Sequence, residues 1–510
     1  MKRIRFALLL VLAVLLGATA VAQETFRIAI GVDPDTLDPV QGTTTTVDNI
    51  LDYVVEPLAS ITENGELVPM LATSWTVADD GLSIDLELRE GVTFHDGTPF
   101  DAEAAVWNIE RVLDPDVRVP RRGPFAAIAS VEATGEHELR VNLSEPAPYM
   151  MGVLAQTLVG MLSPASVDAE GNSLENITMP VGTGPYTYTS RSPSENLIVD
   201  RFDGYWGEMP YYDRVVFQVV PEATTRESLL LADQVDLIIL PPTSDIPALE
   251  ANPRTEVVLG PSNRTIFIVL NNDAPELQDA RVRQALNYAV DKEAIVQGIL
   301  FGAADVMDAP MADSLFGYEE IGAYPYDPER ARELLAEAGV EPGELTLDFI
   351  APTGRYVQDF AAAQAIANFL REVGVDTEVR TMDWPSYVGT IVRPPDEQDV
   401  EMHLLGWAPS FMDASQQMQQ FLTSQHPPNG LATSFYDNPE VDRLVDAANQ
   451  ETDPERRAEL YAEASRLVWE DAPWIFLWVQ RFPMVHAADV TNIWGLPNEK
   501  FYAIYARPAE

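Results

Sequence analysis

The sequence predicts an α/β fold that is divided into two or three domains. A chain of 510 residues is longer than one hydrophobic core usually supports, and 46% of its residues are hydrophobic, which is ample for packed cores. A strand-like segment at 214–220 is followed by a helix-like segment at 221–232 and an apolar segment at 235–240. This order favours a mixed or parallel sheet. No Gly/Ser-rich linker interrupts the chain, so we expect closely connected domains.

The first 22 residues have the composition of a secretory signal peptide. Lys2, Arg3 and Arg5 form a positive start, residues 6–16 form an apolar core, and the Ala-Val-Ala triplet at 20–22 fits a cleavage site. The apolar run is short for a membrane span. Because the chain has no cysteine, it cannot carry a lipid on one. We therefore expect cleavage after residue 22 and a periplasmic protein without a lipid anchor.

The composition argues against several classes of function. With 80 acidic and 32 basic residues, the formal net charge is −48, which disfavours binding to nucleic acid or to an anionic membrane surface. The acidic surface fits a saline habitat and ordinary solubility equally well. The absence of cysteine excludes disulfides and thiolate chemistry, and the five histidines have no paired spacing. No hydrolase nucleophile motif occurs. We therefore predict no metal site, no cofactor and no enzyme activity.

The first half of the chain is expected to be rich in strands. Residues 26–32 form an apolar segment that ends at a Pro-rich turn. Residues 82–88 and 139–143 alternate between apolar and polar side chains, which is the period of a half-buried strand. Between them, Asp101 is placed to cap a helix that Asp114-Pro115 closes.

Strand and helix signals alternate in the second half. An apolar strand is expected at 264–272 and another at 474–479. Asp279, Asp327 and Asp453 each precede a helical pattern, and two of them are followed by proline at the first helical position. A further helix is expected at 360–370 and a strand at 376–382.

Four ordered stretches resemble landmarks of the extracellular solute-binding proteins of family 5. They are residues 71–109, which contain VTFHDGTPF; VGTGPY (181–186) with DGYWG (203–207); RVRQALNYAVDKEAIV (281–296) with YDPERARELLAEAG (326–339); and the Gly-Trp loop that begins at Gly406. Together they cover essentially the whole mature chain. The resemblance implies a periplasmic-binding-protein-like α/β fold with two main lobes, hinge strands between them and an extra third domain. Lobe I would contain residues 23–46, 178–261 and 484–510, lobe II 47–177 and lobe III 262–483.

The resemblance also implies a function. The protein would be the substrate-binding receptor of an ATP-driven ABC importer, enclosing a peptide or peptide-like solute between lobes I and III. It would deliver that solute to a permease in the inner membrane, which works with ATPase subunits, and would act as a monomer. Alternatives are the same role for a non-peptide solute, such as an oligosaccharide or an opine, and a solute-sensing or chaperone-like protein.

The Gly-Trp loop supplies the first candidate ligand-binding residues. Gly406 allows close approach of the backbone, and Trp407 offers a flat apolar face with one N–H donor. A tryptophan buried in the core at a strand end is the alternative. Peptide-binding members of the family have an aspartate, which pairs with the ligand α-amine, where this chain has Ser410. Asp413 is therefore a candidate to replace it, and a ligand without a strict amine clamp is expected.

Two further segments complete the candidate site. Arg355 matches a loop in which family members often place a positive residue for the ligand carboxylate, and a guanidinium suits that contact. The alternative is a surface arginine on a turn. Thr43, Thr44 and Thr45 match a loop that contacts ligand in dipeptide-binding relatives, while helix capping is the alternative role for them.

Overall fold

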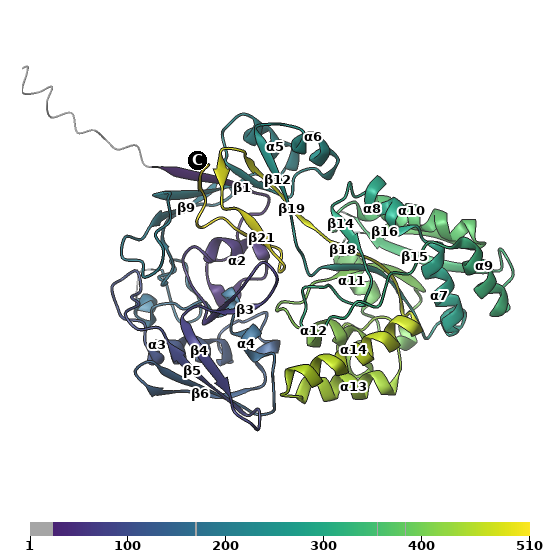
Figure 1. Ribbon diagram of the computed structural model, residues 1–510, viewed down its shortest axis with the longest axis horizontal. Coiled ribbons are helices and arrows are strands. Elements are labelled where there is room, and N and C mark those ends of the chain that lie inside the picture. Colours follow the sequence, from purple (N-terminus) through teal and green to yellow (C-terminus); the bar gives the residue numbers. More distant parts are fainter. Residues whose placement is uncertain (1–23, 169–170, 354, 383, 510) are drawn as a thin grey trace, which may run out of the picture.

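The computed structural model describes residues 24–168, 171–353, 355–382 and 384–509. The expected signal peptide at 1–22 lies outside these residues. Among the residues described, no helix is both long and apolar enough to cross a membrane. The chain folds as an α/β protein around three larger sheets, which occupy three regions of the molecule in Figure 1.

A seven-stranded sheet contains the strand–helix–strand unit that the sequence predicts. Its strand order is β12-β19-β11-β1-β10-β9-β8. Strand β1 (Thr25–Ile30) lies between β10 (Arg214–Val219) and β11 (Leu237–Ile239) and runs parallel to both, and α5 (Ala223–Leu231) connects β10 to β11. The other members are β8 (Tyr186–Ser192), β9 (Asn196–Arg201), β12 (Thr255–Gly260) and β19 (Phe482–Ala487). Helix α6 (Ile246–Glu250) packs against β12.

A four-stranded antiparallel sheet, in the order β4-β5-β7-β6, forms the second region. The predicted alternation holds in β5 (Ser83–Leu88), where Ile84, Leu86 and Leu88 are buried. Helix α3 (Ala102–Leu113) packs on this sheet, and the Asp101 side chain accepts a hydrogen bond from the Ala104 amide, which confirms the predicted cap. The remaining elements are β4 (Ala72–Val77), β6 (Ile128–Gly135), β7 (Glu138–Leu143), α4 (Met150–Val153) and the small pair β2 (Ala59–Ile61) and β3 (Leu67–Pro69).

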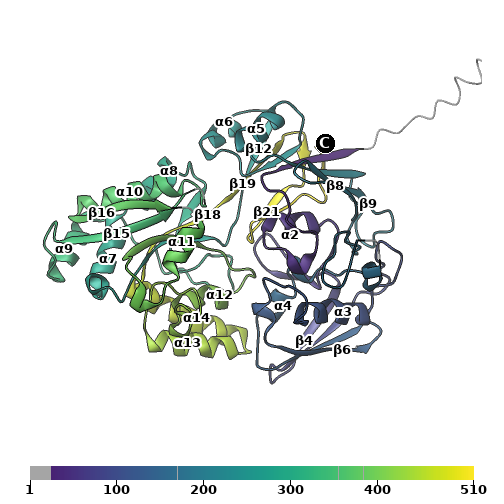
Figure 2. The same cartoon turned by 180° about the vertical axis from the view of Figure 1, so that it is seen from behind.

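A six-stranded sheet, in the order β14-β18-β13-β17-β15-β16, is buried on both faces. Along β13 (Thr265–Leu270), Ile266, Ile268 and Leu270 join one hydrophobic cluster, while Phe267 and Val269 join another on the opposite face. In Figure 2, α7 to α10 lie in the upper part of this region and α13 and α14 in the lower part, with α7 in contact with α14. The predicted caps Asp279, Asp327 and Asp453 each accept a backbone N–H.

The other elements around this sheet are β14 (Ala304–Val306), β15 (Leu345–Pro352), β16 (Val375–Met382), β17 (Met402–Trp407), β18 (Trp474–Gln480), α7 (Ala280–Ala289), α8 (Lys292–Gly298), α9 (Pro328–Glu337), α10 (Asp359–Glu372), α11 (Trp384–Ile391), α12 (Ala414–Met418), α13 (Pro439–Gln450) and α14 (Pro454–Asp471). The C-terminal segment forms two small pairs, β20 (Val490–Thr491) with β23 (Arg507–Pro508) and β21 (Trp494–Leu496) with β22 (Lys500–Tyr502).

Two connections join the seven-stranded and six-stranded sheets. One runs from β12 to β13 through residues 261–264, and the other passes from β18 to β19 through Arg481. The boundaries of the three proposed lobes stay a prediction. Helix α2 (Thr45–Leu51) spans the predicted boundary between lobes I and II, and its apolar residues Val47, Ile50 and Leu51 share a hydrophobic cluster with strands of lobe I.

The VGTGPY and DGYWG segments both donate hydrogen bonds to one buried carboxylate. Glu56 is 1% exposed and accepts hydrogen bonds from the hydroxyls of Thr183 and Tyr205 and from the indole N–H of Trp206, at 2.7–2.8 Å. Gly182 is required beside it, because a Cβ there would lie 2.0 Å from the Val54 carbonyl oxygen. The hydrogen bonds from these segments to Glu56 therefore hold lobe I against the start of lobe II.

Glu56 gives a testable pH dependence. Burial raises its pKa from 4.5 to about 7, although its hydrogen-bond donors lower it. Between these values the folded state holds a proton that the unfolded chain releases, so the free energy of unfolding falls as pH rises, by up to about 1.4 kcal/mol per pH unit. We expect Glu56→Gln to remove this slope in urea unfolding measured from pH 4.5 to 7. The exposed Glu63→Gln should retain it; a wild-type slope in Glu56→Gln would contradict the assignment.

Candidate functional site

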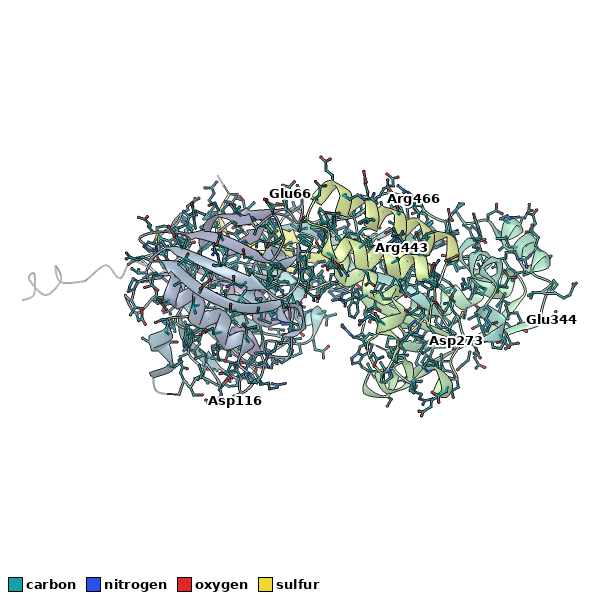
Figure 3. The ribbon with its side chains drawn as sticks, turned by 90° about the horizontal axis from the view of Figure 1, so that it is seen from below. Glu66, Asp116, Asp273, Glu344, Arg443 and Arg466 are labelled. Atoms are coloured by element: carbon teal, nitrogen blue, oxygen red, sulfur yellow. The ribbon has the colours of Figure 1, made fainter. Side chains whose placement is uncertain are left out.

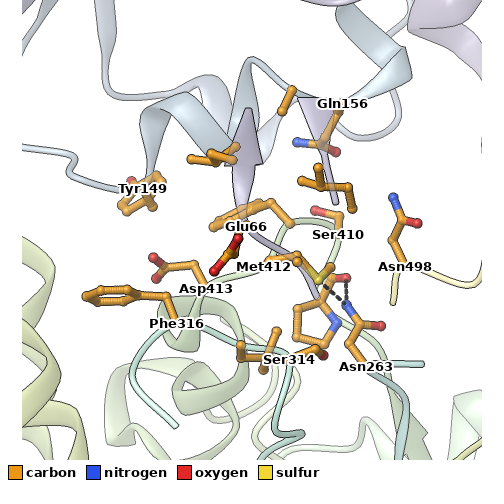
Figure 4. A pocket seen from close by; sticks show the side chains of 18 of the residues that line it. Glu66, Tyr149, Gln156, Asn263, Ser314, Phe316, Ser410, Met412, Asp413 and Asn498 are labelled. Carbon is orange, nitrogen blue, oxygen red and sulfur yellow. Dashed lines mark hydrogen bonds between the residues drawn. The ribbon is translucent and has the colours of Figure 1, made fainter. Parts of the chain in front are cut away.

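A cavity of about 770 Å³ lies where the three proposed lobes meet. Figure 4 shows side chains from opposite walls converging on it, including Tyr149 and Gln156 on one side and Ser410 and Phe316 on the other. Its walls come from segments far apart in the sequence: 43–48, 61–67, 75–81, Arg121, 147–157, 263–264, 313–316, 408–413, 452–457 and 498–500.

A glutamine at the start of α12 helps to hold the loop at 408–413 in place. This loop follows β17 and precedes α12. The side-chain oxygen of Gln416 accepts the amide N–H of Ser410 at 2.5 Å and its hydroxyl at 3.1 Å. The Trp407 indole donates to the Gln416 carbonyl oxygen at 3.2 Å. Ser410 therefore faces the cavity from a loop that Gln416 and Trp407 fix in shape.

Gly406 and Trp407 contact the protein core. A Cβ on Gly406 would lie 2.6 Å from Ile266 Cδ1 and 2.7 Å from the Tyr356 ring, and the Tyr356 hydroxyl donates to the Gly406 carbonyl oxygen at 3.2 Å. Trp407 is half-buried and packs against the core of lobe III. Neither residue is among the described residues that line the cavity. The missing side chain of Gly406 therefore makes room for Tyr356 and not for a ligand.

Asp413 lines the cavity, but its carboxylate already accepts hydrogen bonds from Arg457 and from the Ser415 amide. Its two oxygens each accept a hydrogen bond from the Arg457 guanidinium at 2.7 Å, and one also caps α12 through the Ser415 amide at 2.9 Å. The side chains of Asp413 and Arg457 are only 8% and 4% exposed. Burial disfavours the charge on Arg457, but the adjacent carboxylate outweighs this and raises its pKa. Asp413 thus neutralises a buried arginine.

Phe411 joins lobes II and III directly. It belongs to the lobe III loop, yet it is 4% exposed within the hydrophobic cluster of lobe II. Its ring stacks on Tyr149 with centroids 5.5 Å apart and planes 18° from parallel. Phe411 also lies beside Gly152, since a Cβ placed on Gly152 would be 3.6 Å from the Phe411 Cβ. Phe411 therefore stabilises the arrangement in which these lobes are together.

The remaining predicted residues are divided between the cavity and other roles. Thr43 and Thr45 line the cavity. Thr44 does not, among the described residues; it caps α2 by accepting the Val47 amide at 3.4 Å. Arg355 also lies off the cavity: its guanidinium carbon is 5.0 Å from the Tyr356 ring centroid and 5.1 Å from that of Trp384. A ligand role for Arg355 stays a prediction.

Of the described residues on the cavity wall, the positive side chains have ion-pair partners, whereas two of the negative ones do not. Each of the four cationic side chains among the described lining residues forms an ion pair with a protein carboxylate. These pairs are Arg121–Asp48 (2.8 Å), Arg264–Glu499 (2.6 Å), Arg457–Asp413 (2.7 Å) and Lys500–Asp52 (2.5 Å). Glu66 and Asp313 also line the cavity, and within the described chain their carboxylates have no ion-pair or hydrogen-bond partner.

Several cavity residues were not anticipated from the sequence. Glu66, Asp313, Asn263, Tyr149 and Phe411 lie in loops or short connections without a recognisable motif. Only the position of Phe411, next to Ser410 in the Gly-Trp loop, hinted at a role. The others reach one cavity because of how the lobes pack, which local patterns do not encode.

Comparisons with known proteins show which family this chain belongs to. Residues 66–429 match the model of the bacterial extracellular solute-binding proteins, family 5 middle region. The chain is 30% identical to the glutathione-binding protein GsiB of Escherichia coli O1:K1 over 494 residues, covering 96% of this chain and 95% of that protein.

Solved structures have the same fold. HbpA2 from Haemophilus parasuis superposes with a TM-score of 0.85 at 23% identity, covering 95% of this chain and 100% of that one. The periplasmic binding protein DppA from Helicobacter pylori, in complex with the peptide STSA, gives 0.74 at 24% identity, covering 94% and 98%. The expected periplasmic-binding-protein-like fold is therefore confirmed.

Proposed function

Because this chain belongs to the bacterial extracellular solute-binding proteins of family 5, we propose that it is the periplasmic receptor of an ABC importer for a peptide or peptide-like solute. The observation that carries the proposal is the cavity of about 770 Å³, whose walls come from all three proposed lobes. That volume lies within the range of about 300–1,000 Å³ common for small-molecule sites. The names of the relatives, a glutathione-binding and a peptide-bound protein, support a peptide-like solute.

The fold supplies a way to enclose the solute. Among the described residues, the backbone passes between lobes I and III at 261–264 and at Arg481, so rotation about these two connections would change the width of the cavity. A solute that contacts both walls favours the closed state, because only differential contacts shift the equilibrium. Closure also excludes water, which strengthens each polar contact.

The receptor role requires recognition rather than catalysis. Ser410 and Gln156 line the cavity, and we propose that such polar side chains bind and orient the solute. The closed form would then be presented to a permease in the inner membrane, which ATPase subunits drive. We propose that the protein acts as a monomer in the periplasm and is not an enzyme.

Mass spectrometry of small molecules released from gently purified protein tests this function. We expect a peptide or peptide-like molecule, and calorimetry with that molecule should then show stoichiometric binding. A released oligosaccharide would keep the receptor role and overturn the peptide-like class. Turnover of the released molecule by the purified protein would contradict the receptor proposal.

A further inference from the structure

The charged side chains that the cavity leaves unpaired are carboxylates, which attract positive charge. Each lining cation is already neutralised by a protein carboxylate, whereas Glu66 and Asp313 are exposed and without a partner in the described chain. Figure 3 shows Glu66 at the junction between the two halves of the molecule, and Figure 4 shows it among the side chains that line the cavity.

The two free carboxylates belong to segments that touch across the lobes. Glu66 follows Gly65 in lobe II, and Asp313 precedes Ser314 in lobe III. A Cβ on Gly65 would lie 2.8 Å from the Ser314 carbonyl oxygen, so these two segments are in contact. A cation placed between Glu66 and Asp313 would therefore be held by both lobes at once.

A buried amide gives independent evidence of an unfilled contact. Asn263 is 0% exposed, lies in the connection between lobes I and III, and lines the cavity. Its side-chain nitrogen donates to the Pro409 carbonyl oxygen at 2.7 Å, but its side-chain oxygen has no hydrogen-bond partner. The side-chain oxygen of Asn498, also on the cavity wall, is likewise buried and unpartnered. Such acceptors cost free energy unless a donor meets them.

We infer that, given the proposed receptor function, this cavity selects solutes with a cationic end, such as the ammonium or guanidinium groups of basic peptides. Glu66 and Asp313 would bind the positive charge, and Asn263 would accept an N–H. This arrangement moves the charge recognition away from the Gly-Trp loop, where Ser410 stands in place of an aspartate and Asp413 is held by Arg457.

The same arrangement disfavours solutes rich in carboxylates. A ligand carboxylate is bound most strongly by a cation that is not already paired, and no such cation lines the cavity among the described residues. Glutathione carries two carboxylates and one amine. We therefore infer that this chain differs in solute charge from its glutathione-binding relatives.

Calorimetry with peptides of different charge tests the inference. The probes are Lys-Ala-Lys with an amidated C-terminus, the same peptide with all amines acetylated, and glutathione. We expect the cationic peptide to bind at least about tenfold more tightly than either of the others, and more weakly as salt is added. Glu66→Gln and Asp313→Asn should each weaken its binding about tenfold.

Matched control variants are available on β16. Glu378→Gln and Asp376→Asn change exposed carboxylates that lie away from the cavity, and they should bind like wild type. If glutathione and the acetylated peptide bind as tightly as the cationic one, or if Glu66→Gln and Asp313→Asn bind like their controls, the charge selection is wrong and the receptor function stands. If no peptide of any charge binds, the proposed function fails together with this inference.

Discussion

The Asp413→Ala variant is expected to lose about 3–5 kcal/mol of free energy of unfolding, because it leaves Arg457 buried without a counter-charge. The Arg457 side chain is 4% exposed, and both of its bonds to Asp413 are 2.7 Å long. The variant also removes the cap of α12. Urea unfolding, followed by circular dichroism, measures the effect.

Two further variants separate the pair from other roles of Asp413. Replacing both partners, as in Asp413→Ala with Arg457→Met, should recover most of the stability, since no charge is then left buried. Glu440→Ala breaks the Arg443–Glu440 pair, whose side chains are 60% and 54% exposed, and should change little. If Asp413→Ala kept wild-type stability but lost peptide binding, Asp413 would be the amine-binding residue after all.

The Phe411→Ala variant is expected to bind its solute about 100-fold more weakly than wild type. Truncating a buried phenylalanine typically costs about 3–5 kcal/mol, and here that cost falls on the state in which lobes II and III are together. Phe411 lies in the core of lobe II at 4% exposure only when the lobes meet. A shift of about 3 kcal/mol towards the open state lowers the apparent affinity by this factor.

Calorimetry with the released solute measures this loss, and small-angle scattering reports whether the free protein is more extended. Phe360→Ala is the matched control, because Phe360 is 38% exposed at the start of α10 and does not line the cavity. Unchanged affinity in Phe411→Ala would show that the stacking on Tyr149 does not contribute to closure.

Local signals were sufficient to predict much of the fold. Asp101, Asp279, Asp327 and Asp453 cap helices as expected, because a cap depends on residues within one turn. The alternation in β5 also held, although Leu82 lies outside the strand and is 40% exposed. Such elements need no knowledge of distant segments.

The candidate site depends on distant segments and was predicted only in part. Asp413 and Arg457 are 44 residues apart, and nothing local to either reveals that they pair. Phe411 belongs to a lobe III loop but is buried in lobe II, so its burial follows from the docking of lobes. Trp407 has the features of a ligand-stacking residue in isolation, yet its indole N–H is used to hold the loop that carries Ser410.

Spin-label distances provide the most direct test of solute enclosure between the lobes. The chain has no cysteine, so Asp116→Cys and Asp273→Cys create unique labelling sites on exposed residues of lobes II and III, both visible in Figure 3. With the solute released from the purified protein added at saturation, we predict a distance distribution that shifts towards a single shorter value. A distribution that stays unchanged when calorimetry shows the solute to be bound would contradict closure of the lobes around it.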